Sequence, residues 1–126
     1  MANELTLSNS FTYDDGKVKP IGRALESLVV NVSTKRFSHQ QHNIGVTEEA
    51  VTLGEVATLG WFWLRNLDTT NFVEWRVSTG STKAARANGG ANGGEAMMFR
   101  VGSGVTAPYL IADTGAVDVE YFLFAS

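Results

Sequence analysis

The sequence predicts an all-β fold, an antiparallel β-sandwich of jelly-roll type with seven to eight short strands. Val, Thr and Ile together supply 28 β-branched residues, which favour strands over helices. Apolar and polar side chains alternate in short runs, and turn signals separate these runs at intervals of roughly 8 to 12 residues. The 126 residues are enough for one hydrophobic core and too few for two ordinary ones.

Composition and charge exclude several classes of protein. Hydrophobic residues make up 44% and charged residues 18%, the balance of a globular domain. The net charge of -3 lacks the basic field that phosphate binding requires, so no nucleic-acid partner is expected. The absence of cysteine excludes disulfides, thiolate metal sites and cysteine nucleophiles. Because no run of about 18 apolar residues occurs and the N-terminus is polar, neither a membrane partner nor an export signal is expected.

The chain is expected to divide into an N-terminal arm or edge strand at residues 1–23 and a β-sandwich domain at residues 24–126. In the first part, a weakly alternating stretch precedes Asp15-Gly16, a pair that accepts the positive φ of a tight turn. The second part begins with a strand at residues 24–33, in which one pleat face is more apolar than the other.

The middle of the chain predicts several short elements. Residues 36–46 are too polar for a central strand and fit an exposed edge strand or a loop. Residues 51–53 alternate briefly and predict another short strand. Residues 66–71 are dense in side chains that hydrogen-bond their own backbone, so a hairpin connection is expected there. A strand follows at residues 72–78, and Glu74 marks one of its faces as partly wet.

The glycine-rich stretch at residues 89–94 has the lowest ordering tendency in the chain and predicts a mobile tip. It lacks the Lys-Ser/Thr ending that a phosphate-binding loop needs. Strands are expected after it at residues 95–101 and 117–124. The residues assigned to the mobile loop, including the two basic residues at its foot, are Lys83, Arg86, Gly89, Gly90, Gly93 and Gly94.

Two segments are apolar on both strand faces, residues 61–64 and residues 121–124. A two-layer sandwich buries only one face of each sheet, so such segments need a second cover. A neighbouring subunit or partner is favoured over the chain's own loops as that cover. The residues assigned to core and interface contact are Trp61, Trp63, Tyr121, Phe122 and Phe124.

The sequence contains no recognisable catalytic or metal-binding motif, so no enzyme activity, metal or cofactor is expected. His39 and His42 are the only histidines, and a separation of three places them on opposite faces of a strand. Glu48 and Glu49 are interpreted as a solvated pair, and no two carboxylates are singled out as a hydrolytic pair.

The tryptophans allow an alternative function. Trp61, Trp63 and Trp75 could stack on the faces of sugar rings if they were exposed. A carbohydrate-binding module that recognises a host glycan is therefore the second hypothesis.

Two stretches resemble small virion structural proteins of tailed bacteriophages. They are GVTEEAVTLG at residues 45–54 and GWFWLRNLDTTNFVE at residues 60–74, and the most specific part is residues 65–74. Shorter matches extend the similarity to roughly residues 45–126: FRV at 99–101, APY at 107–109, ADT at 112–114 and VDVEY at 117–121. The chain departs from the group at residues 81–94, which are richer in Gly and Ala.

The resemblance implies a non-enzymatic β-sandwich protein of the virion, present in many copies and with no catalytic residues. Capsid decoration or cement is the expected role, and neck, tail and fibre positions are compatible with it. The expected partners are the chain itself, as a trimer or larger assembly, and a major capsid or tail protein. The expected location is the virion, assembled in the host cytoplasm.

Overall fold

The structure is a computed structural model that describes residues 4–13, 16, 21–31, 37–80 and 83–125. Within these residues every regular element is a strand, and two antiparallel sheets pack together, which confirms the predicted all-β sandwich. The strands are β1 (Glu4–Tyr13), β2 (Ile21–Asn31), β3 (Phe37–Ile44), β4 (Glu49–Ala50), β5 (Leu59–Asn66), β6 (Val73–Arg76), β7 (Lys83–Ala87), β8 (Ala96–Arg100), β9 (Tyr109–Ala112) and β10 (Val117–Ala125).

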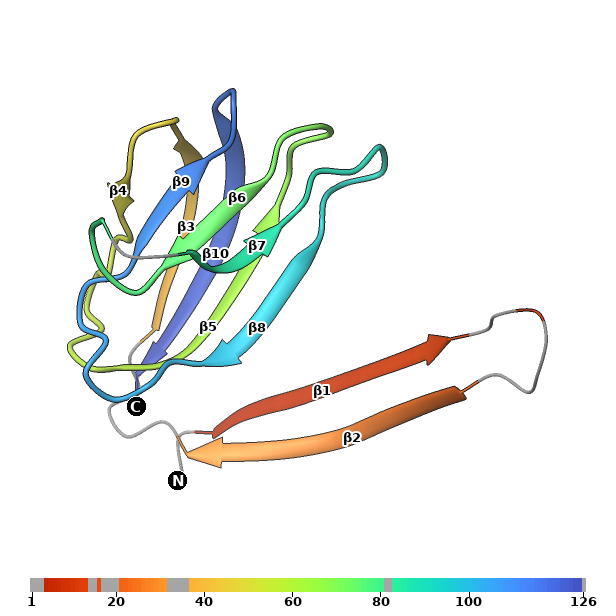
Figure 1. The fold of residues 1–126 in the computed structure, drawn as a ribbon. Helices are drawn as coiled ribbons and strands as arrows, with labels where there is room; N and C mark the ends of the chain where they lie inside the picture. Colours follow the sequence, from red (N-terminus) through yellow and green to blue (C-terminus); the bar gives the residue numbers. More distant parts are fainter. Residues whose placement is uncertain (1–3, 14–15, 17–20, 32–36, 81–82, 126) are drawn as a thin grey trace.

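Eight of these strands form the sandwich (Figure 1). One sheet has the order β3-β10-β5-β8, the other has the order β4-β9-β6-β7, and all neighbouring strands are antiparallel. From β3 to β6, successive strands alternate between the two sheets. β7 lies beside β6 in the same sheet, and from β7 to β10 successive strands again alternate between the sheets. This order of eight strands is that of a jelly roll, built from two Greek keys.

The core lies between the two sheets and follows from strand alternation. Along β10 the odd-numbered side chains are buried and the even-numbered ones point away from the core. Phe62 and Leu64 on β5 and Leu110 on β9 meet Tyr121 and Leu123 there, and all five are fully buried. Packing of these two inner faces is what fixes the sandwich.

The N-terminal strands form a separate two-stranded sheet rather than part of the sandwich. Among the described residues β1 pairs only with β2, and Figure 1 shows this ribbon projecting from one end of the sandwich. The expected boundary between residues 23 and 24 falls inside β2. The strand predicted at residues 24–33 is confirmed over its described part, residues 24–31, and the rest lies outside the described residues. Alternation does not reveal which strand is its neighbour.

Two other sequence expectations also need correction, and one is confirmed. No strand forms at residues 51–53, where the nearest strand is the two-residue β4. Residues 66–71 do not connect a hairpin, because β5 and β6 belong to different sheets. Residues 37–44 do form an edge strand, β3, whose polar side chains face solvent on the outer side. The described residues contain no helix that could cross a membrane.

Candidate interaction surface

The outer face of the β3-β10-β5-β8 sheet carries a continuous group of large apolar side chains. The pairing register aligns the outward-facing residues into rows that cross the four strands. In strand order, the first row is Phe37, Phe124, Trp61 and Arg100, and the second row is His39, Phe122, Trp63 and Met98. We call these eight residues the aromatic face.

The rings of the aromatic face pack against one another. The imidazole of His39 lies parallel to Phe122, with 4.0 Å between ring centroids. Trp63 meets Phe122 edge-on at 5.6 Å, and Phe122 stacks on Phe124 at 6.3 Å. Phe37 extends the group to the sheet edge, 6.4 Å from Phe124. The three distances among the phenylalanine and tryptophan rings lie in the range of favourable aromatic pairs, so these rings form a preformed surface.

This surface is only partly covered. Phe37 is 59% exposed and Met98 is 44% exposed, at the two edge strands. Trp61, Trp63 and Phe122 are half-buried by their neighbours. The Nε1 donor of Trp61 is buried and has no hydrogen-bond partner among the described residues. A contiguous apolar surface of this kind is unusual on an isolated soluble domain.

Charged and polar groups border the aromatic face on one side. A third row crosses the strands as Gln41, Glu120, Arg65 and Ala96. Glu120 pairs with His39 at 3.0 Å, and both side chains remain partly exposed. In the next row Asn43 donates a hydrogen bond of 2.8 Å to Asp118. The first two rows are therefore mainly aromatic and apolar, with Arg100 and His39 at their ends, and the third row carries Glu120 and Arg65.

The structure separates the five predicted interface residues into two groups. Trp61, Trp63, Phe122 and Phe124 lie together on the aromatic face. Tyr121 is fully buried in the core, where its hydroxyl accepts a hydrogen bond of 3.0 Å from the Thr52 N–H. Tyr121 therefore cannot contact a partner, and its assignment to the interface is corrected.

Trp75 does not belong to any exposed platform. It is 5% exposed in the core, where its ring meets Phe62 at 6.2 Å and Phe99 at 4.8 Å. The three tryptophans therefore do not form one sugar-stacking surface, although two of them share the aromatic face.

The predicted mobile loop is held by backbone hydrogen bonds instead of forming a free tip. The Gly90 N–H donates to the Asp68 carbonyl at 3.1 Å, and the Gly94 N–H donates to the Asn66 carbonyl at 2.9 Å. A Cβ on Gly89 would lie 2.6 Å from the Thr70 nitrogen. The glycines thus allow the loop to pack closely against the β5–β6 connection. A glycine-rich sequence is compatible with either close packing or a mobile loop, so the sequence alone does not distinguish the two.

The residues expected at the base of this loop have different surroundings. The side chain of Lys83, at the start of β7, lies outside the described residues. The guanidinium of Arg86 lies 3.8 Å from the centroid of the Phe72 ring and 3.1 Å from Glu74. Arg86 therefore belongs to a charged network on the outer face of the second sheet and not to a mobile base.

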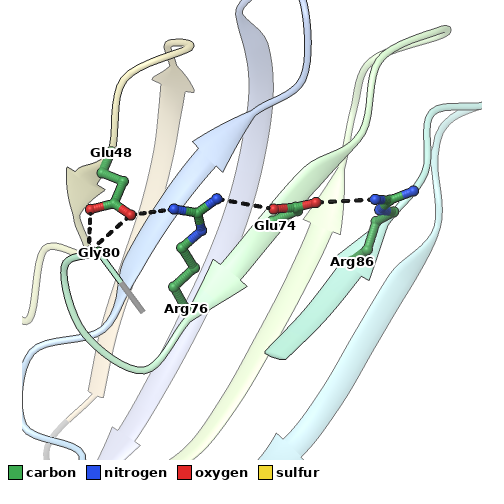
Figure 2. A network of polar contacts seen from close by, with 5 residues as sticks. All are labelled: Glu48, Glu74, Arg76, Gly80 and Arg86. Carbon is green, nitrogen blue, oxygen red and sulfur yellow. Dashed lines mark hydrogen bonds and ion pairs between the residues drawn. The ribbon is translucent and has the colours of Figure 1, made fainter. Parts of the chain in front are cut away.

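That network joins four charged residues across the second sheet (Figure 2). Arg76 lies between two carboxylates, Glu48 and Glu74, and Glu74 also contacts Arg86. Glu74 is only 3% exposed, although its alternation with Arg76 predicted a partly wet face. Burial of this carboxylate is compensated by the two guanidinium groups.

Hydrogen bonds set the ionisation of Glu48. The Gly80 N–H and the Thr79 hydroxyl each donate to its carboxylate at 2.8 Å, and Arg76 adds a charge-assisted bond. These donors lower the pKa of Glu48 below its ordinary value of 4.5, and the Glu48 bond in turn raises the pKa of Arg76. Glu48 and Glu49 are therefore not a solvated pair; Glu49 accepts a bond from the Gly45 N–H.

The two histidines lie on opposite faces of β3, as their spacing predicts. His39 pairs with Glu120 on the outer face, whereas the His42 Nε2 lies 3.7 Å from Glu49. Among the described residues, no group of three or more His, Cys, Asp or Glu side chains could hold a metal ion. The histidines therefore contribute ion pairs and ring stacking in this structure.

Packing within one chain does not account for the partly exposed rings of the aromatic face. Four of its residues are predicted from the sequence, and the strand register adds the other four, Phe37, His39, Met98 and Arg100. Neither any protein-family model nor any characterised protein or solved structure matches the chain significantly.

Proposed function

We propose that this chain is a non-enzymatic structural protein of a bacteriophage virion, which decorates or cements the capsid by associating with itself and with the particle surface. The observation that carries the proposal is the aromatic face. Half-exposed rings occupy the side of a sheet that a solitary sandwich would leave to water. The resemblance of residues 45–126 to small virion proteins supports the same role.

Burial of apolar area supplies the binding energy in this proposal. Each Å² of apolar surface removed from water contributes roughly 25 cal/mol, so a modest contact gives useful affinity. In a particle, many symmetric copies act together, and avidity then exceeds the affinity of one contact by orders of magnitude. A chain without a strong individual interface can therefore still hold a particle together.

The β1–β2 ribbon supports the proposal as a second contact element. Both outer edges of this two-stranded sheet lack a neighbouring strand among the described residues. Figure 1 shows the ribbon extending well beyond the sandwich, where it can reach another molecule. An isolated two-stranded ribbon is marginally stable in water, so contact with a partner would stabilise it.

A carbohydrate-binding role is the second candidate, because Trp61 and Trp63 are both partly exposed on one face. The fold is compatible with both roles, since jelly rolls include viral capsid and lectin domains. The packing of the rings favours assembly. His39 covers one side of Phe122 at 4.0 Å and Trp63 packs edge-on against the same ring, so two of the rings are already engaged with their neighbours within the face.

Sedimentation velocity over a range of concentrations tests the proposal. The purified chain should associate reversibly, and Met98→Ser should weaken association by about tenfold because every copy loses apolar contact. Val46→Ser is the matched control, since Val46 is 54% exposed but lies outside the aromatic face. Only 13.6 kDa monomers at every concentration would contradict self-association.

Two further measurements separate the candidate functions. Images of intact phage particles that contain this chain should show it on the capsid surface in many copies, and its absence from the particle would contradict the virion role. Titration with oligosaccharides should leave tryptophan fluorescence unchanged. A saturable change in emission, abolished by Trp63→Ala, would support the carbohydrate-binding candidate instead.

A further inference from the structure

We propose that the aromatic face binds the aromatic face of a second copy of this chain, related by a two-fold axis that runs parallel to the strands between β10 and β5. This inference rests on the proposed function and deepens it by naming the partner and the geometry of one contact. A two-fold contact requires a surface that is complementary to itself. The rows of the aromatic face have this property.

The geometry follows from the strand order. An axis parallel to the strands keeps each row in place but exchanges β10 with β5 and β3 with β8. Phe122 then lies opposite Trp63 of the second copy, and Phe124 lies opposite Trp61 of the second copy. The apolar centre of one face covers the apolar centre of the other.

Charges in the third row are complementary under the same axis. Glu120 and Arg65 occupy equivalent positions in this row, on β10 and β5. The two-fold operation places each Glu120 opposite the other copy's Arg65, so the contact contains two such pairs. Arg65 is exposed and makes no ion pair with any described residue of its own chain. Opposed charges of this kind orient a contact and disfavour other registers.

The edge strands fit the arrangement as well. Phe37 on β3 lies opposite Arg100 of the second copy on β8, where a guanidinium can approach an exposed ring. His39 lies opposite Met98 of the second copy. Twisted sheets that pack face to face cross at about 30°. The residues of the central strands β10 and β5 therefore stay opposite their proposed partners more closely than those of the edge strands β3 and β8.

A two-fold axis perpendicular to the strands is less favourable. If it is centred on the sheet, Phe122 lies opposite Glu120 of the second copy, and a carboxylate is buried against a ring without a cation. If it is shifted to lie between the two apolar rows, the charged third row falls outside the contact and the buried area shrinks. Only the axis parallel to the strands buries the apolar rows and pairs the charges together.

The area predicts a weak, reversible dimer. Four strands about 4.8 Å apart and about 27 Å long present roughly 500 Å² per copy. The total of roughly 1,000 Å² lies at the lower limit for a specific interface. Association of the free chain is therefore expected at roughly micromolar concentrations. A larger assembly, such as the expected trimer or higher oligomer, requires a second contact elsewhere on the chain.

Charge reversal and mixing test the proposed pairing. Glu120→Lys alone places two lysines opposite two arginines, and Arg65→Glu alone places two glutamates opposite two carboxylates. Each variant should dimerise at least about 100-fold more weakly than the unchanged chain. An equimolar mixture of the two should restore a heterodimer, because the introduced lysine meets the introduced glutamate and the remaining Arg65 meets the remaining Glu120. Sedimentation velocity with one variant labelled measures this.

Asp118→Lys is the matched control. It alters the net charge by the same amount as Glu120→Lys and lies two residues away on the same face of β10, but no outward residue of β5 lies opposite it under the proposed axis. Its dimerisation should stay within about threefold of the unchanged chain. Circular dichroism and thermal unfolding of each variant confirm that the sandwich is intact before association is compared.

The outcomes separate this inference from the proposed function. If the unchanged chain associates but the mixture of variants does not, the two-fold geometry is wrong while self-association stands. Loss of association in Asp118→Lys to the same extent as in Glu120→Lys also overturns the pairing, because it reveals only a net-charge effect. If the unchanged chain never associates, the proposed self-association itself fails.

Discussion

Glu48 illustrates how one residue can hold distant parts of the chain together. Its carboxylate accepts bonds from Thr79 and Gly80, about thirty positions away, and also pairs with Arg76 at the end of β6. A carboxylate with several donors is stabilised in its ionised form, which is why its pKa is lowered. The contribution of Glu48 to stability therefore depends on pH.

We expect the contribution of Glu48 to the free energy of unfolding to decrease as the pH is lowered. The folded-state pKa of Glu48 lies below its ordinary value of 4.5, so its stabilising effect is present above about pH 4.5 and is lost as the pH falls through the lowered pKa. Glu48→Gln keeps the shape but removes the charge. Urea unfolding between pH 7 and pH 3 should show a shallower loss of stability in the variant, and parallel profiles would contradict this role.

Glu74 shows that strand alternation alone does not predict whether a charged side chain is buried. Its position on β6 predicts a partly wet face, yet it is 3% exposed and pairs with two arginines. Arg86 comes from the neighbouring strand β7 and is twelve positions away in sequence. Alternation fixes which side chains share a face, but the strand register determines which charges meet.

At the scale of elements, the loop at residues 88–95 depends on its glycines for close contact with the β5–β6 connection. Asn66 is the last residue of β5, and its buried amide donates to the carbonyls of Asn71 and Ala87. Asp68 accepts backbone bonds from the two residues that precede Phe72. These hydrogen bonds hold the connection in place where the glycine loop packs against it.

Two glycine substitutions test this contact. A Cβ at Gly94 would lie 2.6 Å from the Asn66 carbonyl oxygen, so Gly94→Ala should reduce the free energy of unfolding by about 1–3 kcal/mol. Gly102→Ala is the control, because nothing lies within 4 Å of its added Cβ and its φ is not positive. Chemical denaturation measures both; equal stabilities would show that the loop moves away without cost.

At the scale of the whole molecule, the sandwich and the β1–β2 ribbon differ in how much hydrophobic packing they have. The sandwich has a continuous core between two four-stranded sheets. In the part of the chain that the structure describes, each strand of the β1–β2 ribbon has a single neighbouring strand, and Leu5 of the ribbon packs against the core cluster. A two-stranded ribbon with so little cover should open independently of the sandwich.

Hydrogen–deuterium exchange should reveal this difference. In the free monomer, backbone amides of β1 and β2 should exchange at least about 100-fold faster than those of β10, because the ribbon opens locally whereas β10 opens with the entire core. β10 lies between β3 and β5, so both of its edges are paired. Equal protection of the ribbon and β10 would contradict this division.

The sequence by itself determined the fold class and the composition of each strand face. The period of two in residues 117–124 identifies Phe122 and Phe124 as neighbours on one face and Tyr121 on the other. The excess of apolar side chains on both faces also follows from the sequence, because a two-layer sandwich has only one interior.

Only the tertiary structure decided which face points inward and which strands meet. Placing β10 between β3 and β5 brings His39 against Phe122 and puts Trp63 beside it, although these residues are far apart in sequence. The same is true of the separate β1–β2 ribbon. Alternation is a local property of the backbone, whereas strand partners are selected by the total area that the two sheets bury together.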